Sequence, residues 1–157
     1  MAVYMQVEGV KGSSTEKNHV DWIPIKSCEF PVDRPGVNTV PGKISDRLRS
    51  AVDFPDITLR KDADMSSPNL MKWMVEGLTK KVIIAFCKEK GEEVLRLTLY
   101  DTVITNLNTT VNADEQPEET VKLDFTRIDM VFTTYNAQNK FGGNFPVNYD
   151  LGKASVV

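Results

Sequence analysis

Histidine and carboxylate side chains are the groups in this chain that could carry acid–base chemistry, and the chain has 1 histidine. His19 has no serine or cysteine in a nucleophile motif and no orienting acid recognisable beside it, so it is a weak candidate for a general base. A histidine on the surface or at the edge of a strand is the better interpretation. We therefore predict that the chain is not an enzyme.

The stretch GVNTVPGKIS, residues 36–45, comes nearest to a phosphate-binding loop. Such a loop has four residues between its glycines and a Ser or Thr after its lysine. This stretch has five residues there and places Ile44 after Lys43. The sequence DADM, residues 62–65, lacks the downstream glutamate of a calcium-binding loop. Neither a cofactor nor a metal site is predicted.

Cys28 and Cys87 each lie within an apolar run, which favours two reduced thiols in the core over a disulfide. The formal net charge is −3 and the pI is about 5.2. Non-specific nucleic-acid binding requires a basic surface, which a chain of this composition does not supply. We therefore expect no nucleic-acid partner.

A length of 157 residues fits a single domain, residues 1–157. The first ten residues, MAVYMQVEGV, lack the basic and apolar regions of a secretory signal peptide, and no apolar run is long enough to span a membrane. We expect the chain to fold in a cytoplasm. If it leaves the cell, it would use a route other than general secretion.

Alternating apolar residues predict about eight strands, arranged as an antiparallel β-barrel or a two-sheet sandwich. Pro24 cannot donate to a neighbouring strand, so the run around it is predicted to be an edge strand or to break there. The buried phase changes within residues 120–135, which predicts a bulge or bend near Thr126 and Arg127. The pair Gly142-Gly143 is interpreted as a turn before a short final strand.

One flanking helix is predicted over residues 67–79. Ser67 is expected to accept hydrogen bonds from the free amides of the first turn, and Pro68 fits the first helical position. Five apolar residues at helical spacing are expected to cover an open face of the β structure. These are Leu70, Met71, Met74, Val75 and Leu78.

Trp73 falls with Lys72 and Glu76 on the other side of this helix, and aromatic residues are enriched at interfaces. The alternative is that Trp73 lies over the edge of the apolar stripe as part of the core. A second unusual segment, residues 31–53, is punctuated by Pro and Gly and keeps no strand or helix period. Its length predicts a long, functional loop that extends from the body.

From the residues alone, two functions fit this mainly β domain: assembly into a larger object, and ligand binding in a β-barrel. Four motifs then occur in order along nearly the whole chain: VEGVKGSSTEKNHVDWI, DITLRKDADMSSPNLMKWMVEGL, LRLTLYDTVITNL and EETVKLDFTRIDMVFTTY. Together they resemble the Hcp family, the haemolysin-coregulated tube proteins of bacterial type VI secretion systems. The most specific parts are the Gly9–Gly12 turn running on to His19, the Lys61-x-x-Asp64-x-Ser66-Ser67-Pro68 sequence and the Glu119-x-Val121-x-Leu123-x-Phe125 strand.

This resemblance implies a structural subunit that forms hexameric rings, which stack head to tail into a hollow inner tube. A contractile sheath surrounds and propels such a tube, and some members hold effector proteins in the lumen. The implied partners are other copies of the chain and the sheath, spike and effector proteins, with secretion that needs no signal peptide and no stable membrane insertion. The alternatives are a tube protein of a phage-like contractile particle and a monomeric ligand-binding β-barrel.

Two sets of candidate residues follow from this interpretation. The candidates for contact with a neighbouring subunit or the sheath lie on the polar side of the helix or in the long loop: Lys72, Trp73, Glu76, Arg34, Val40, Lys43 and Arg47. The candidates for the wall of the lumen occupy outward positions of strands: Arg96, Thr98, Thr105, Asn106, Lys122 and Asp124.

Overall fold

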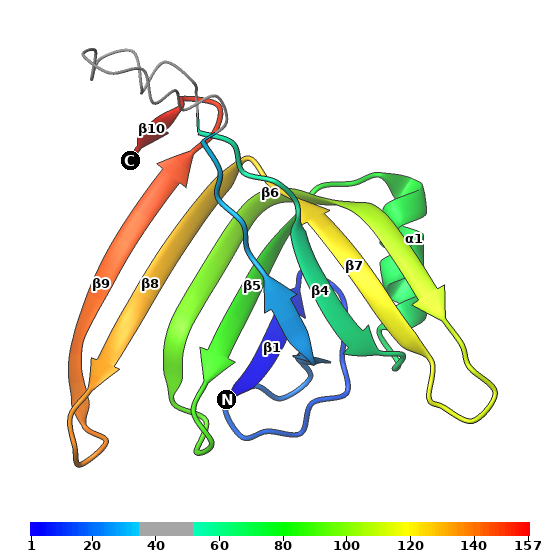
Figure 1. Cartoon of the computed structure of the whole chain (residues 1–157), viewed down its shortest axis with the longest axis horizontal. Helices are drawn as coiled ribbons and strands as arrows, with labels where there is room; N and C mark the ends of the chain where they lie inside the picture. The colour runs from blue at the N-terminus through cyan, green and yellow to red at the C-terminus, as the bar shows by residue number, and fades with distance from the viewer. Residues whose placement is uncertain (35–51) are drawn as a thin grey trace, which may run out of the picture.

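The strands of this chain form a bent antiparallel sheet with one helix at its side, as Figure 1 shows for a computed structural model. The structure describes residues 1–34 and 52–157. Val40, Lys43 and Arg47 lie outside the described residues, as do most of the predicted loop and all of the stretch compared with a phosphate-binding loop.

The described residues contain 10 strands and 1 helix. In chain order these elements are β1 (Ala2–Val7), β2 (Ile23–Ile25), β3 (Ser27–Glu29), β4 (Ile57–Asp62), α1 (Ser67–Glu76), β5 (Lys80–Cys87), β6 (Glu93–Thr110), β7 (Glu118–Asp124), β8 (Arg127–Tyr135), β9 (Phe141–Asp150) and β10 (Ser155–Val156). The predicted mainly β, antiparallel class with one flanking helix is confirmed. The sheet stays open and does not close into a complete barrel.

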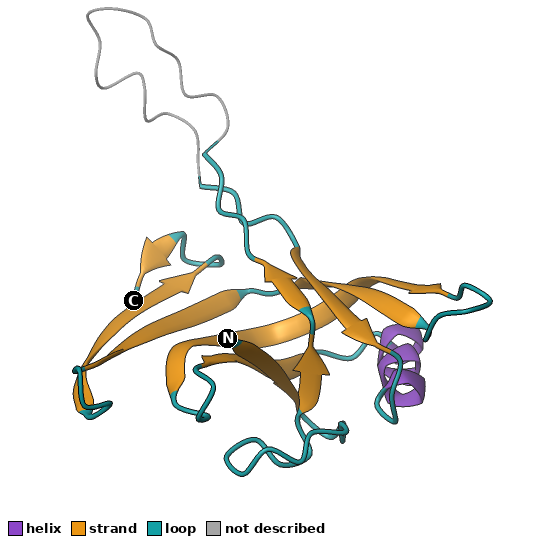
Figure 2. Cartoon of the chain, turned by 60° about the horizontal axis from the view of Figure 1, so that its bottom comes forward, coloured by secondary structure: helices purple, strands orange, loops and turns teal. Residues whose placement is uncertain are grey.

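The 18-residue strand β6 belongs to two layers of the sheet. Its first half lies in a layer of order β10-β9-β8-β6-β5-β1-β2, here called the broad layer. Its second half pairs with β7, which continues to β4 and β3 and completes the short layer. Asp101, with a φ of 49°, and a register shift between Ile104 and Asn106 interrupt the strand where it passes between the layers. The layers therefore share one core (Figure 2).

The predicted change of buried phase near Thr126 and Arg127 is the corner between these layers. Strand β7 ends at Asp124 in the short layer, and β8 begins at Arg127 in the broad layer. The Thr126 amide donates to the Tyr100 carbonyl at 3.1 Å, which holds the corner against β6. The prediction of a bend is therefore confirmed.

The interpretation of Gly142-Gly143 as a turn is wrong, because both glycines lie inside the ten-residue strand β9. The hairpin turn comes earlier, where the Asn136 amide donates to the Lys140 carbonyl at 2.9 Å. A Cβ on Gly142 would lie 2.8 Å from Thr134 Oγ1, so the absent side chain allows the strands to approach closely at a register shift.

Strand β2 pairs with β1 at the end of the broad layer, so the prediction of an edge strand at Pro24 is confirmed. Apolar residues from both layers and the helix fill the shared core. Among its fully buried members are Met5, Ile23, Ile57, Leu59, Leu70, Ile84, Leu99, Val121 and Leu123.

The helix is rotated about its axis from the predicted position: of the five residues predicted to face the core, only Leu70 is buried. Trp73 is 1 % exposed and lies with the buried Leu70 in the core, and its indole Nε1 donates to the Leu78 carbonyl at 2.6 Å. Met71 and Val75, from the predicted buried stripe, are exposed. A buried Trp removes more apolar area from water than a smaller residue, and here its N–H also finds an acceptor. The alternative placement of Trp73 in the core is therefore the observed one.

Replacing Trp73 by Ala is expected to lower the free energy of unfolding by about 3–5 kcal/mol, because it opens a cavity between α1 and the sheet. The matched change Val75→Ala on the exposed side should alter it by less than about 0.5 kcal/mol. Urea unfolding followed by circular dichroism measures both values. Equal, small effects of the two substitutions would contradict the buried position of Trp73.

Candidate functional site

A buried lysine determines where the helix begins. The Lys61 side chain on β4 is 0 % exposed, and its Nζ lies 2.8 Å from Glu119 Oε2 on β7. The same ammonium lies 3.2 Å from Asp64 Oδ1 and 3.4 Å from Ser67 Oγ, just before and at the start of α1. A buried charge is tolerated when it is paired and hydrogen-bonded in this way. We call these four residues the lysine cluster.

The lysine cluster replaces the helix cap that the sequence predicts. Ser67 Oγ accepts from the Asp64 amide at 3.0 Å, and the N-cap residue is Ser66. Burial raises the pKa of the Asp64 carboxyl, but hydrogen bonds from Ser66 and the charge of Lys61 more than offset this, so the net shift is downward. Three residues of the helix-start motif, Lys61, Asp64 and Ser67, therefore meet around the Lys61 ammonium.

The helix presents an apolar stripe to solvent. Met71, Met74 and Val75 are 62 %, 39 % and 77 % exposed, and Leu78, two residues beyond the end of α1, is 55 % exposed. The predicted interface residues Lys72 and Glu76 are also exposed and form an ion pair with an Nζ to Oε1 distance of 3.8 Å. Of the helix residues proposed for an interface, only Trp73 is buried. We call the four apolar residues the helix stripe.

The broad layer carries a second exposed apolar surface, on its core-facing side. Along β8, Ile128 is buried and Met130 is partly buried, whereas Phe132 is 45 % exposed. Its cross-strand partner Phe145 is 63 % exposed, and Val147, opposite Met130, is 57 % exposed. The core face of the sheet therefore continues into solvent along β8 and β9. We call Phe132, Phe145 and Val147 the hairpin face.

Sequence reasoning missed the hairpin face, although part of its signal was present. The alternation of apolar residues in β8 was recognised, but β9 was interpreted as a turn and a short strand. A continuous alternation over residues 145–149, opposite an alternating β8, would have predicted a longer hairpin. Whether other elements cover that hairpin cannot be determined from periodicity alone.

The six residues proposed for a lumen fall on two different surfaces. Arg96 and Thr98 lie on the outer face of the broad layer, opposite Val131 and Asp129 of β8. The other four lie on the short layer, where Asn106 pairs with Lys122 in the sheet register and Val103 pairs with Asp124. Thr105 Oγ1 there donates to Asp56 Oδ2 at 2.5 Å. The two layers share one core, and these groups lie on the faces turned away from it, on separate sides of the molecule. Arg34, the remaining described candidate, is exposed.

His19 is buried, contrary to the surface or strand-edge position expected. It is 1 % exposed, and its ring stacks on Tyr4 with a centroid distance of 4.9 Å. Nδ1 lies 2.5 Å from Glu16 Oε2 and Nε2 lies 2.9 Å from Glu93 Oε1. Both ring nitrogens are thus engaged by carboxylates, and Glu93 lies 74 positions away in the sequence. This arrangement ties residues 11–22 to the outer face of β1, β5 and β6.

The carboxyl groups around His19 have lowered pKa values. The hydrogen bond with His19 is the largest cause for Glu16. For Glu93, burial raises the pKa, but hydrogen bonds with Arg96 and His19 lower it further than burial raises it. The ionised forms of these carboxylates therefore stabilise the fold at neutral pH.

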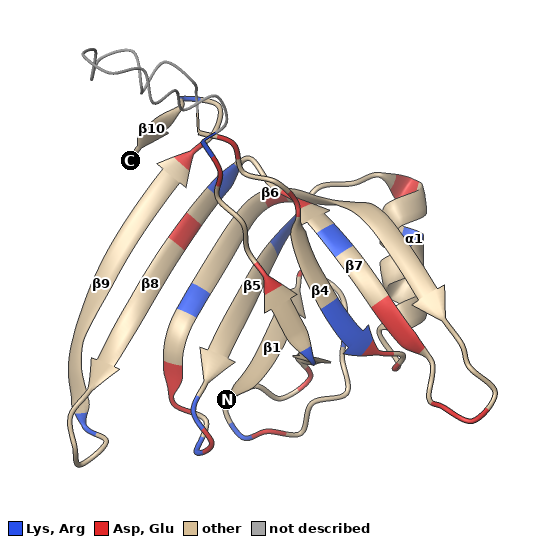
Figure 3. Ribbon diagram, in the orientation of Figure 1, with Lys and Arg blue, Asp and Glu red and all other residues tan. Residues whose placement is uncertain are grey.

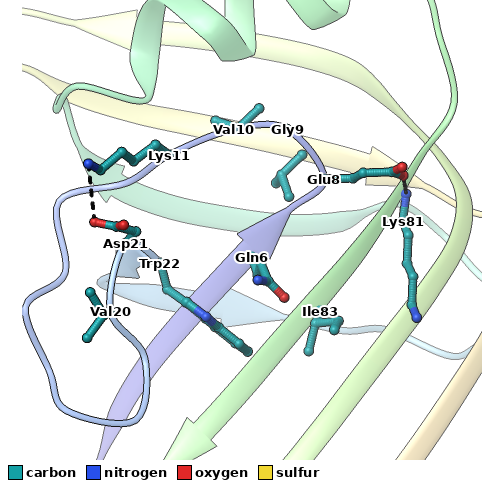
Figure 4. A pocket seen from close by; sticks show the side chains of 11 residues that line it. Gln6, Glu8, Gly9, Val10, Lys11, Val20, Asp21, Trp22, Lys81 and Ile83 are labelled. Carbon is teal, nitrogen blue, oxygen red and sulfur yellow. Dashed lines mark hydrogen bonds and ion pairs between the residues drawn. The ribbon is translucent and has the colours of Figure 1, made fainter.

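A surface pocket of about 560 Å³ lies beside the Gly9–Gly12 turn (Figure 4). Lys11 and Asp21 form an ion pair at its rim, with an Nζ to Oδ1 distance of 3.6 Å, and Trp22 lines its wall. A Cβ on Gly12 would lie 2.4 Å from the Trp22 carbonyl oxygen, which explains the glycine in this motif. This pocket lies at the surface and has Glu8, Lys11, Asp21 and Lys81 among its lining residues, so it differs from the deep apolar cavity expected of a ligand-binding barrel.

Cys28 and Cys87 are free thiols, as predicted. Burial raises the pKa of Cys28 to about 12 and that of Cys87 to about 11. In residues 1–34 and 52–157, no group of three or more His, Cys, Asp or Glu side chains could hold a metal ion. The same part of the chain has no helix long and apolar enough to cross a membrane.

Solved structures of type VI secretion proteins share this fold. A structure described as a type six secretion system protein aligns with a TM-score of 0.90 at 15 % identity, covering 99 % of both chains. Hcp1 from Salmonella typhimurium aligns with a TM-score of 0.80 at 20 % identity, covering 99 % of this chain and 98 % of its own. The secreted protein Hcp3 from Pseudomonas aeruginosa aligns with a TM-score of 0.62 at 18 % identity, covering 94 % of this chain and 98 % of its own. The fold is therefore that of type VI secretion proteins.

The sequence narrows this class to one family. The family described as "Type VI secretion system effector, Hcp" matches residues 4–132, and the chain belongs to it. The resemblance stated from the four motifs is confirmed. No curated protein matches the chain in sequence.

Replacing Lys61 by Ala is expected to lower the free energy of unfolding by about 3–5 kcal/mol, because it leaves Glu119 buried without its partner. The double variant Lys61→Met, Glu119→Leu should recover most of that loss, since it removes both buried charges and keeps similar volumes. Urea unfolding of the two variants and the wild type measures the difference. A double variant as unstable as Lys61→Ala would show that the pair does not act as a unit.

The lowered pKa values of Glu16 and Glu93 predict a loss of stability in acid. The contribution of each carboxylate is fully present above its ordinary value of 4.5 and is lost as the pH falls through the lower folded value. The free energy of unfolding should therefore fall steeply below about pH 4.5. His19→Gln should flatten this fall, and unchanged pH dependence in that variant would contradict the assignment.

Proposed function

We propose that this chain is the structural subunit of the inner tube of a type VI secretion system, forming hexameric rings that stack into a hollow tube. The observation that carries the proposal is the hairpin face, where the apolar core side of the broad layer continues into solvent. Exposed apolar patches of this kind mark protein–protein contacts. Membership of the Hcp family supports a tube role in particular.

An open sheet suits a ring. A ring forms when two different surfaces of one chain meet in neighbouring copies and the rotation between them closes. In this chain β9 and β10 lie at one end of the broad layer and β1 and β2 at the other, so the layer has two different ends available. A second head-to-tail contact along the axis would stack the rings without limit.

The outer face of the broad layer is the proposed wall of the lumen. Arg96, Thr98 and Asp129 lie there on neighbouring strands, and a water-filled channel requires polar residues of this kind. The short-layer candidates, including Lys122 and Asp124, would then lie on the outside of the tube. Lys72 and Glu76, at the exposed edge of α1, would face the sheath.

The remaining partners follow from the same proposal. Rings would assemble in the cytoplasm, receive effector proteins in the lumen and be secreted by the contracting machine together with the spike. The role is structural and requires no catalytic group. A tube of a phage-like contractile particle would use the same subunit architecture, and the genes adjacent to the coding sequence distinguish these two settings.

Negative-stain electron microscopy of the purified wild-type chain at neutral pH tests the ring. We expect uniform six-fold rings with a central hole, and short stacks of them at high protein concentration. Light scattering on the eluate of a sizing column gives the mass independently. A wild-type chain that remains a monomer in both measurements up to millimolar concentration would contradict the proposed function.

Gold labelling tests which face lines the lumen. The raised pKa values of Cys28 and Cys87 make these thiols poor nucleophiles, so a cysteine introduced on the surface is labelled selectively. A maleimide-gold label on Thr98→Cys should appear inside the ring, whereas a label on the matched variant Lys122→Cys should appear outside it. The reverse pattern would assign the lumen to the short layer.

A further inference from the structure

Two exposed apolar surfaces lie at opposite ends of this molecule. The helix stripe is on the outer side of α1, and the hairpin face is on β8 and β9. Figures 1 and 2 both place α1 at one end of the sheet and β9 at the other, so these surfaces do not meet within one chain.

The hairpin face can be given an approximate size. A whole aromatic side chain buries about 150–250 Å², so the exposed fractions of Phe132 and Phe145 leave roughly 160–270 Å² of aromatic surface. Val147 adds to this area, and soluble monomers rarely expose apolar patches beyond a few hundred Å². With a polar rim, a patch of this size forms the centre of a standard interface, which buries about 800 Å² on each partner.

Both surfaces lack uncompensated charge at their centres. Residues 130–149 contain one charged side chain, Lys140 in the hairpin turn, and Asp129 and Asp150 border this stretch. On the helix, the charges beside the stripe, Lys72 and Glu76, pair with each other. Packing these two surfaces together therefore buries apolar area without burying an unpaired charge.

We propose that the helix stripe of one copy packs on the hairpin face of the next copy, and that this is the contact that closes the ring. The inference deepens the proposed function, on which it rests, by naming the two surfaces that meet. Each copy donates its helix stripe to one neighbour and its hairpin face to the other. One kind of contact, repeated around the ring, then covers both surfaces of every subunit.

Pairing of like surfaces would not cover both surfaces of every subunit. If two hairpin faces packed together in a two-fold dimer, both helix stripes would remain in water, and the reverse pairing would leave both hairpin faces exposed. A head-to-tail contact buries both kinds of surface through one interface, and so does a two-fold dimer with reciprocal stripe-to-hairpin contacts; the mass of the wild-type assembly distinguishes a ring from such a dimer. The head-to-tail contact also gives the repeating, directional contact that a ring needs.

The charges at the edges of the two surfaces are complementary. The loop between β6 and β7 lies at the α1 end of the molecule, and residues 112–119 contain 4 acidic and no basic side chains. Glu118 and Glu119 are paired within the chain, which leaves Asp114 and Glu115 in the loop itself. The turn of the β8–β9 hairpin carries Lys140 at the opposite end (Figure 3). In a head-to-tail contact the acidic loop of one copy lies toward the lysine of the next.

Mixing two variants tests this pairing. Val75→Asp places a charge in the helix stripe, and Phe145→Asp places one in the hairpin face. Each variant alone should be monomeric, with an apparent dissociation constant raised about 30-fold or more over that of the wild type. Mixed in equal amounts, they should form dimers of one copy each, because Val75→Asp keeps an intact hairpin face and Phe145→Asp keeps an intact helix stripe.

The matched control is Val20→Asp, which changes an exposed valine of residues 11–22, outside both surfaces. It should form rings like the wild type. Native mass spectrometry gives the masses, and circular dichroism verifies the fold of every variant. If Phe145→Asp does not fold, Val147→Asp on the same face replaces it.

The outcomes separate this inference from the function on which it rests. If the wild type forms rings and Val75→Asp or Phe145→Asp still forms them too, the pairing is overturned and the tube role stays intact. Dimers of either variant alone, or no dimers in the mixture, would also overturn the pairing. A wild-type chain that is monomeric throughout would overturn the proposed function and this inference together.

Discussion

The buried ion pair between Lys61 and Glu119 is the interaction on which the rest of this structure depends. These residues are cross-strand partners in β4 and β7, so their contact specifies the register of the short layer. A slip of one residue would place a charge in the core without its partner, which is a large penalty. The same ammonium contacts Asp64 and Ser67, so the register of a sheet and the start of a helix are determined together. The orientation of α1, with Trp73 inward and the helix stripe outward, follows from that fixed starting point and from the hydrogen bond of the indole to Leu78.

The second organising feature is the length of β6. One strand pairs with β5 and β8 in its first half and with β7 in its second, so a single continuous segment supplies both layers. The core is deepest where the layers overlap, at residues such as Leu99 and Leu123. Toward the tip of β8 and β9 the short layer no longer covers the broad one, and burial decreases from Ile128 to Phe132. The exposed apolar hairpin is therefore a direct result of two layers of unequal width.

The sequence predicted the class of the fold because periodicity reports which face of a strand is buried. It located the helix to within a few residues and the corner near Thr126, since both leave a local mark on the pattern. It failed on which side of the helix is buried, because spacing alone does not tell whether one Trp or several smaller residues face the core. It failed on His19 because the partner Glu93 is distant in sequence and is brought close by the fold. The hairpin face was missed because an exposed apolar surface depends on which elements fail to cover it, and no local pattern contains that information.

The two cysteines have a consequence for the proposed secretion of this chain. Cys28 lies on β3 in the short layer and Cys87 on β5 in the broad layer, and both thiols have raised pKa values. Disulfide exchange requires a thiolate, which these sites disfavour. The fold is therefore indifferent to redox potential: it uses no disulfide that a reducing cytosol would break, and it offers no ready thiolate to an oxidising exterior. In the proposed tube role, such a subunit would keep the same fold in a reducing cytosol and in an oxidising exterior.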